Sequence, residues 1–205
     1  MNEPLHIGKI VRNARIFNPR NSQAGSTSDS ALLAAIDRLF GLLEEQEIKY
    51  LLVGDIVLLC YVNGRSSEKI DLIVAPSCPD QIPEIRDFEG LQIDLLLTSN
   101  PLFEEVRRRY ATRQRFAERE IPCATPEGLV LLKLYALPSL YRQGNLARVA
   151  LYETDILMLM DRQKVDVEPL FAELQAHVSP TDLASLRGIT DEIRQRIERF
   201  GGQFR

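Results

Sequence analysis

A short apolar run that ends in a glycine and leads straight into a helix is the feature that most limits how this chain can fold. Residues 49–53 (KYLLV) are typical of a buried strand, Gly54 ends it, and residues 55–64 (DIVLLCYVNG) have a helical apolar pattern. Two further apolar runs, 69–75 and 91–97, predict two more strands. This order predicts a small mixed sheet with helices between its strands, an α+β architecture.

The rest of the chain divides into parts of different character. Residues 1–28 end in a polar stretch rich in Ser, Asn and Gly, and we expect a weakly ordered segment there. Residues 29–124 form the predicted α/β core, with an amphipathic helix near 29–46 and a fourth, edge strand within 113–124. Residues 125–205 are expected to be helical and to pack on the core as one structural unit. The prediction is therefore a small mixed sheet with flanking helices, followed by a helical C-terminal half.

Composition excludes several classes of protein. The 205 residues include 25 Lys plus Arg and 29 Asp plus Glu, so the net charge is −4 and a polybasic nucleic-acid binder is not expected. No apolar run reaches the roughly 18–20 residues of a membrane span, and the N-terminal segment lacks the apolar core of a secretion signal. Two His and three scattered Cys cannot assemble a zinc or haem site of the usual kind. We therefore expect a cytoplasmic protein that does not contact membranes.

Several motifs in order resemble the nucleotidyltransferase superfamily, whose best-known member is DNA polymerase β. They are the strand, glycine and helix described above, the KID segment at 69–71, and Asp94 on the next strand. The resemblance is closer to the small bacterial branch that includes AbiEii-type and MenT-type toxins and the minimal nucleotidyltransferases. Downstream, Lys133 in the segment PEGLVLLKLYA resembles the pocket lysine of that branch. Arg148, followed by YETDI at 152–156, resembles a helix of that branch in which an arginine precedes an Asp-Ile pair. The match covers most of the chain.

The resemblance implies a metal-dependent reaction. The family pattern has two carboxylates at positions i and i+2 of a strand and another on the next strand. Because i and i+2 point to one face, such carboxylates can hold paired Mg²⁺ ions that bridge a triphosphate and the attacking hydroxyl. On this pattern Asp71 and Asp94 are the catalytic and metal-binding residues. Mg²⁺ is the expected cofactor only if the protein is active; otherwise none is expected.

The resemblance also implies a set of nucleotide contacts. The backbone N–H groups of the turn after the first strand lie at a helix N-terminus, where phosphates bind. The lysine in the otherwise apolar helix either reaches the surface or meets a carboxylate or a phosphate. The candidate nucleotide-binding residues are Gly54, Asp55, Arg65, Ser67, Lys69 and Lys133.

This chain departs from the family pattern at two positions. Asp55 replaces the second small residue of the turn, and Lys69 replaces the first strand carboxylate. Glu68 is no substitute, because a shift of one residue along a strand reverses the face. A Lys ammonium about 4 Å from a divalent ion costs about 8 kcal/mol at an effective dielectric constant of about 20. That cost equals the binding free energy of a ligand with micromolar affinity.

The two departures have opposite charges. We expect Lys69 to pair with Asp55, or with Asp71 and Asp94, so that the chain's own charges fill the pocket. The predicted function is a nucleotidyltransferase-like protein with a degenerate metal motif, either inactive or limited to weak nucleotide binding. One alternative is an active Mg²⁺-dependent enzyme that transfers NMP from an NTP to a protein or tRNA hydroxyl, as in toxin–antitoxin pairs; another is a structural or oligomerisation module. NTP and a protein are the expected partners.

One basic cluster stands out in the acidic chain. Its arginines could bind the phosphates of RNA or DNA, which leaves nucleic acid as a further partner. Glutamates beside the cluster favour a salt-bridged surface instead. The cluster comprises Arg107, Arg108, Arg109, Arg113, Arg115 and Arg119.

Overall fold

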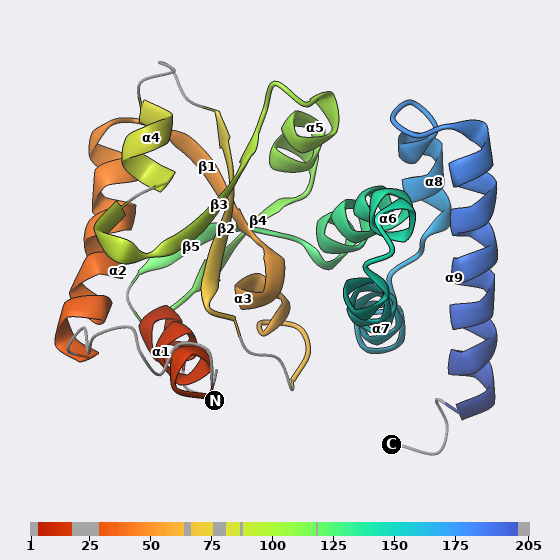
Figure 1. Ribbon diagram of the computed structural model, residues 1–205, viewed down its shortest axis with the longest axis horizontal. Helices are drawn as coiled ribbons and strands as arrows, with labels where there is room; N and C mark the ends of the chain where they lie inside the picture. The colour runs from red at the N-terminus through yellow and green to blue at the C-terminus, as the bar shows by residue number, and fades with distance from the viewer. Residues whose placement is uncertain are drawn as a thin grey trace. The chain divides into compact units, whose positions relative to one another are not determined.

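The chain forms two compact units, Met1–Ala124 and Thr125–Arg205 (Figure 1). The division falls where the sequence predicts that the helical region begins. The predicted packing of the helical region on the core stays a prediction. The structure, a computed structural model, describes the following residues: 4–17, 29–63, 67–75, 81–86, 88–117 and 119–200.

A five-stranded mixed sheet forms the centre of the first unit, with the strand order β3-β2-β1-β5-β4. β2 is antiparallel to β1 and parallel to β3, while β5 is parallel to β1 and antiparallel to β4. The α+β class and the three strands expected from the first apolar runs are confirmed. The strands are β1 (Lys49–Val53), β2 (Lys69–Ala75), β3 (Gln92–Leu97), β4 (Ala111–Arg115) and β5 (Glu120–Ala124).

The single edge strand expected within 113–124 is wrong, because that stretch folds as a hairpin. β4 and β5 pair with each other, and the N–H of Phe116 donates to the carbonyl of Arg119 at 2.9 Å. The buried Phe116 side chain anchors the turn. Because the residues between the two strands include no Gly or Pro, the sequence does not indicate a turn there. The edge strand is β4, and β5 lies inside the sheet beside β1.

The expected weak order of residues 1–28 is also wrong for part of that range. Helix α1 covers Ile7–Phe17, and its buried residues Ile7, Val11 and Ala14 follow a helical spacing. The N–H of Ala117 donates to the carbonyl of Leu5 at 2.8 Å, which joins this segment to the β4–β5 hairpin. The polar stretch at 18–28, which suggested weak order, lies outside the described residues.

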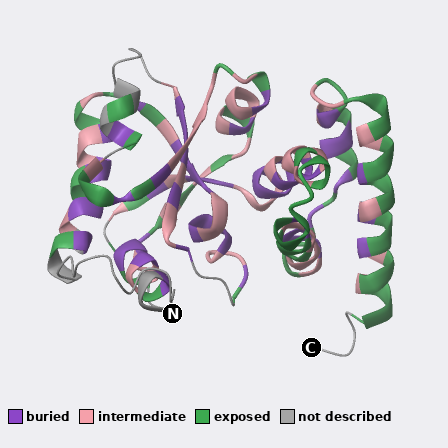
Figure 2. Ribbon diagram, in the orientation of Figure 1, coloured by how far each residue is buried: buried purple, intermediate pink, exposed green. Residues whose placement is uncertain are grey.

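Of the other helices of the first unit, α2 precedes the first strand and the rest connect the strands. The apolar stripe of α2, predicted from its sequence spacing, is fully buried, as the purple bands of Figure 2 show. Asn100 caps the N-terminus of the helix after β3, and its side chain accepts a hydrogen bond from the N–H of Leu102 at 3.0 Å. These elements are α2 (Asp29–Glu45), α3 (Gly54–Leu58), α4 (Gln81–Arg86), the 3₁₀ helix η2 (Phe88–Gly90) and α5 (Pro101–Arg109).

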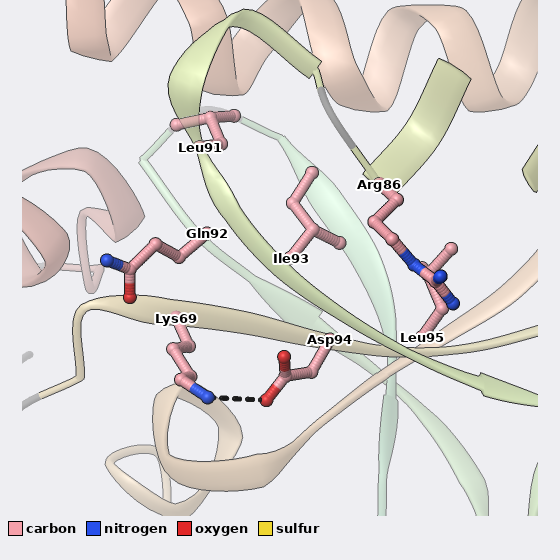
Figure 3. A pocket seen from close by; sticks show the side chains of 7 residues that line it. All are labelled: Lys69, Arg86, Leu91, Gln92, Ile93, Asp94 and Leu95. Atoms are coloured by element: carbon pink, nitrogen blue, oxygen red, sulfur yellow. Dashed lines mark hydrogen bonds and ion pairs between the residues drawn. The ribbon is translucent and has the colours of Figure 1, made fainter. Parts of the chain in front are cut away.

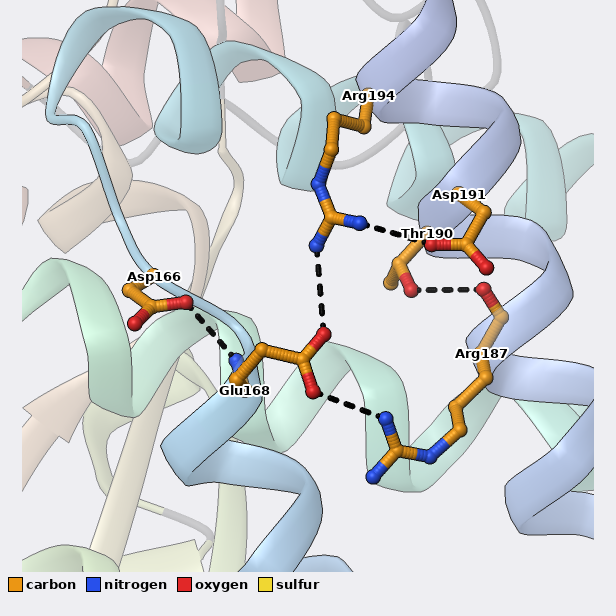
Figure 4. A network of polar contacts seen from close by, with 6 residues as sticks. All are labelled: Asp166, Glu168, Arg187, Thr190, Asp191 and Arg194. Atoms are coloured by element: carbon orange, nitrogen blue, oxygen red, sulfur yellow. Dashed lines mark hydrogen bonds and ion pairs between the residues drawn. The ribbon is translucent and has the colours of Figure 1, made fainter.

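The second unit is helical in its described residues, as the sequence predicts. Exposed ion pairs join α8 and α9, where Glu168 accepts from Arg187 at 2.9 Å and from Arg194 at 3.4 Å (Figure 4). Among the helices that the structure describes, none has both the length and the apolar character needed to cross a membrane. The helices are α6 (Pro126–Arg142), α7 (Leu146–Arg162), α8 (Glu168–Leu174) and α9 (Pro180–Phe200).

A buried ion pair holds α6 against α7. Lys133 Nζ lies 2.9 Å from Asp155 Oδ2, and the two side chains are 6% and 3% exposed. The ammonium also lies 4.4 Å from the centre of the Tyr152 ring. The lysine in the apolar helix therefore meets a carboxylate and does not reach the surface.

Breaking this pair is expected to destabilise the helical unit. Lys133→Met leaves a buried, unpaired carboxylate at Asp155, and we expect it to lower the free energy of unfolding by about 3–5 kcal/mol. The double variant Lys133→Met/Asp155→Leu removes both charges and is expected to lose less. Urea denaturation of the full chain measures the loss of unfolding free energy for both variants. Arg187→Gln is the control, because it breaks an exposed ion pair, and its expected loss is about 1 kcal/mol or less. A loss for Lys133→Met no greater than for Arg187→Gln would contradict this role.

Candidate functional site

The pairing of three strands brings together the carboxylates that the sequence singled out. In the antiparallel register of β1 and β2, Val53 lies opposite Asp71. In the parallel register of β2 and β3, Asp71 lies opposite Asp94. Because Lys69 precedes Asp71 by two positions, Lys69, Asp71 and Asp94 share one face of the sheet.

Lys69 forms an ion pair on this face. Its Nζ atom donates to Asp94 Oδ2 at 2.8 Å, across the gap between β2 and β3 (Figure 3). The two side chains are 45% and 47% exposed, so water reaches the pair. Of the pairings expected for Lys69, the structure shows the one with Asp94.

Gly54 and Asp71 approach each other closely where β1 ends. Gly54 has a φ of +72°, and a Cβ atom built on it would lie 2.1 Å from Asp71 Oδ2. Both the backbone conformation and the space therefore require glycine. Asp55 follows in the first turn of α3, where its negative charge is favourable at the helix N-terminus. The same charge opposes a phosphate at this turn.

These residues do not fit the paired magnesium ions that the resemblance implies. The Lys69 ammonium stands at the strand position of the missing carboxylate and already donates to Asp94. A divalent ion shared by Asp71 and Asp94 would lie next to this positive charge. In the described part of the chain, no group of three or more His, Cys, Asp or Glu side chains is placed to hold a metal ion.

The ion pair forms part of the wall of an open pocket of about 520 Å³ (Figure 3). Five consecutive residues, Leu91–Leu95, line it together with Lys69 and Arg86. Arg86 is the last residue of α4, in a segment where the sequence suggested only a turn. Sequence reasoning therefore missed Arg86, and no motif in that segment marks it.

The other predicted nucleotide contacts are placed differently. The Ser67 side chain is buried, and its hydroxyl donates to the carbonyl of Lys69 at 2.8 Å and accepts from its N–H at 3.2 Å, so it shapes the start of β2. Arg65 lies outside the described residues. Lys133 belongs to the second unit and pairs with Asp155 there, and its contact with a nucleotide stays a prediction. In the same helix as Asp155, Arg148 donates to the Tyr152 hydroxyl at 3.3 Å.

The arginine cluster is mostly engaged in ion pairs. Arg107 binds Glu104 in a bidentate manner, and this hydrogen bonding lowers the pKa of Glu104 from its ordinary value. No described residue pairs with Arg108 or Arg115. The observed surface is thus largely salt-bridged, and nucleic-acid binding by the cluster stays a prediction. The other pairs are Arg109–Glu105, Arg113–Glu120 (3.7 Å), Arg119–Asp37 and Arg119–Glu44.

Comparison with known proteins supports the fold class. The structure is similar to that of an antigenic nucleotidyltransferase-like protein from Paracoccidioides brasiliensis, with a TM-score of 0.58. The two are 14% identical, and the match covers 81% of this chain and 89% of the other. No model of a protein family matches the chain, and no curated protein matches it. The mixed sheet with flanking helices is therefore a nucleotidyltransferase-like fold.

The contact between Gly54 and Asp71 predicts a specific cost for a methyl group. Gly90→Ala is the matched control, because Gly90 has a φ of +71° and no neighbouring heavy atom lies within 4 Å of the place that a Cβ would take. We expect Gly90→Ala to lower the free energy of unfolding by about 1–2 kcal/mol, the cost of the left-handed conformation. Gly54→Ala adds a clash with Asp71 and should cost about 1–3 kcal/mol more. Denaturant titration measures both, and equal losses would contradict the close approach.

Proposed function

We propose that this chain is a nucleotidyltransferase-like protein in which its own ion pair has replaced the metal site, so that it does not transfer nucleotides by the metal-dependent route. The observation that carries the proposal is the 2.8 Å contact between Lys69 Nζ and Asp94 Oδ2. It places a fixed positive charge on the face of the sheet that bears Asp71 and Asp94.

The charges explain why the metal route fails. A divalent ion about 4 Å from the Lys69 ammonium is opposed by about 8 kcal/mol at an effective dielectric constant of about 20. The carboxylate of Asp55 repels a triphosphate at the turn where the family binds it. Both changes weaken the binding of the metal–nucleotide complex, and what remains is weak nucleotide binding or none. We further propose a cytoplasmic protein that acts through a protein partner, by analogy with the toxin–antitoxin branch that the sequence resembles.

An active Mg²⁺-dependent nucleotidyltransferase is the second candidate. One observation favours it: Asp71 and Asp94 lie directly opposite each other on adjacent parallel strands. Such an enzyme requires Lys69 to leave Asp94 when metal binds. The acceptor would be a protein or tRNA hydroxyl.

Thermal unfolding with each of the four NTPs, with and without Mg²⁺, separates the two candidates. A ligand present at about 100 times its Kd raises the Tm of a chain of this size by about 5–11 °C. We expect no Mg²⁺-dependent rise for the natural chain, because Lys69 opposes the ion. The double variant Lys69→Asp/Asp55→Gly should gain such a rise, since it restores the carboxylate and the small turn residue of the family.

The control is Lys49→Asp/Asp55→Gly, which makes the same net charge change but places the new aspartate at an exposed lysine of β1 on the same face of the sheet. It should gain no Mg²⁺-dependent rise. A rise for the natural chain with any NTP would contradict the proposal and favour the active enzyme. A double variant that gains nothing would show that the site does not derive from a metal site.

A further inference from the structure

The pocket of about 520 Å³ follows the outer edge of β3. Successive residues of a strand point to opposite faces, so Gln92 and Asp94 of β3 point to one face of the sheet and Ile93 and Leu95 to the other. These four residues line the same pocket, together with Leu91 just before the strand. Residues of both faces therefore line the pocket, and they belong to a strand at the edge of the sheet. At about 3.3 Å per residue, the five residues extend for roughly 13 Å.

The two edges of the sheet differ in how they resist strand addition. On the β4 edge, Arg113 and Arg115 are exposed, and such charges discourage another strand from pairing. β3 (QIDLLL) has no Lys, Arg or Pro, and its one charge, on Asp94, is balanced by Lys69. Residues 95–97 are all leucine and all partly exposed. The edge of β3 therefore keeps the properties of a strand that another strand can join.

Arg86 gives this edge a preference for negative charge. Its side chain reaches over the pocket from the end of α4, beside Leu95 (Figure 3). It is exposed, and none of the described residues forms an ion pair with it. Because Lys69 and Asp94 neutralise each other, the described residues of the lining keep one net positive charge. An acidic side chain of a bound molecule would supply the missing partner.

We propose that the β3 edge binds an extended acidic peptide, which joins the sheet as a sixth strand and pairs a carboxylate with Arg86. Backbone hydrogen bonds to an edge strand supply the affinity in this mode of recognition, and side-chain pockets supply the specificity. The partly exposed leucines of β3 offer apolar contacts to alternate residues of the peptide. The proposal does not depend on whether the protein is active.

The lining favours a peptide over two other occupants. None of the described lining residues is aromatic, so the pocket lacks the stacking surface on which single-stranded nucleic acids depend. A second copy of the chain would pair two strands of six residues. It would also set a second lining with the same net positive charge against this one, and so would not supply the acid that Arg86 lacks.

Selection from a displayed library of random octapeptides on the full chain tests the proposal. We expect the selected peptides to combine Asp or Glu with β-branched residues. A synthetic, fluorescein-labelled copy should lose affinity by about two- to five-fold with Arg86→Gln, as expected for an exposed ion pair. Arg115→Gln is the matched control, an exposed arginine on the opposite edge strand, and should change nothing. N-methylation of alternate peptide amides should abolish binding, and hydrogen exchange of residues 91–95 should slow when the unmethylated peptide binds.

Four results would overturn the proposal. One is a selection that enriches no peptide, and another is a set of binders indifferent to Arg86→Gln and to N-methylation. A third is concentration-dependent dimerisation that protects the amides of residues 91–95, which assigns the edge to a second copy. The last is protection of the same amides by a mixed-sequence RNA oligonucleotide, which assigns it to nucleic acid.

Discussion

The parallel pairing of β2 with β3 decides which charged side chains meet on one face of the sheet. It places Asp71 beside Asp94 and brings Lys69 close enough to donate to Asp94 at 2.8 Å. With a carboxylate at position 69, the same register would give three acids on one face, a set suited to divalent ions. With lysine at position 69, the register gives an ion pair between Lys69 and Asp94. The side chain at position 69 thus replaces a third acid with an internal ion pair on the same backbone, and Asp71 stays as an acid beside it.

The rest of the first unit supports that pairing. Gly54 lets the β1–α3 turn pass directly against the Asp71 carboxylate, which lies opposite Asp94 of the ion pair. α4 and η2 return the chain to β3 and leave Arg86 beside its outer edge. The Lys69–Asp94 ion pair and the edge of β3 are therefore neighbours, since both contribute residues to the same pocket.

Local patterns in the sequence predicted most of the sheet, and long-range contacts supplied what they missed. The runs at 49–53 and 69–75 are central strands buried by the core, so their apolar character is visible in the sequence. The β4–β5 hairpin was missed because its turn lacks Gly and Pro, and α1 was missed because the polar stretch at 18–28 dominated its surroundings. For the site, the sequence showed that Asp55 and Lys69 depart from the family pattern. It did not choose between the pairings of Lys69, because that choice depends on the register of β2 against β3.

In the proposed function, the Lys69 ammonium takes the place of a metal ion beside Asp94. Anomalous diffraction from crystals grown with Mn²⁺ and a non-hydrolysable NTP analogue tests it most directly, because Mn²⁺ scatters strongly and accepts the ligands of Mg²⁺. We predict no anomalous peak between Asp71 and Asp94, with Lys69 Nζ still in contact with Asp94. A manganese ion bound to both carboxylates, with Lys69 turned away, would contradict the account and identify a working metal site.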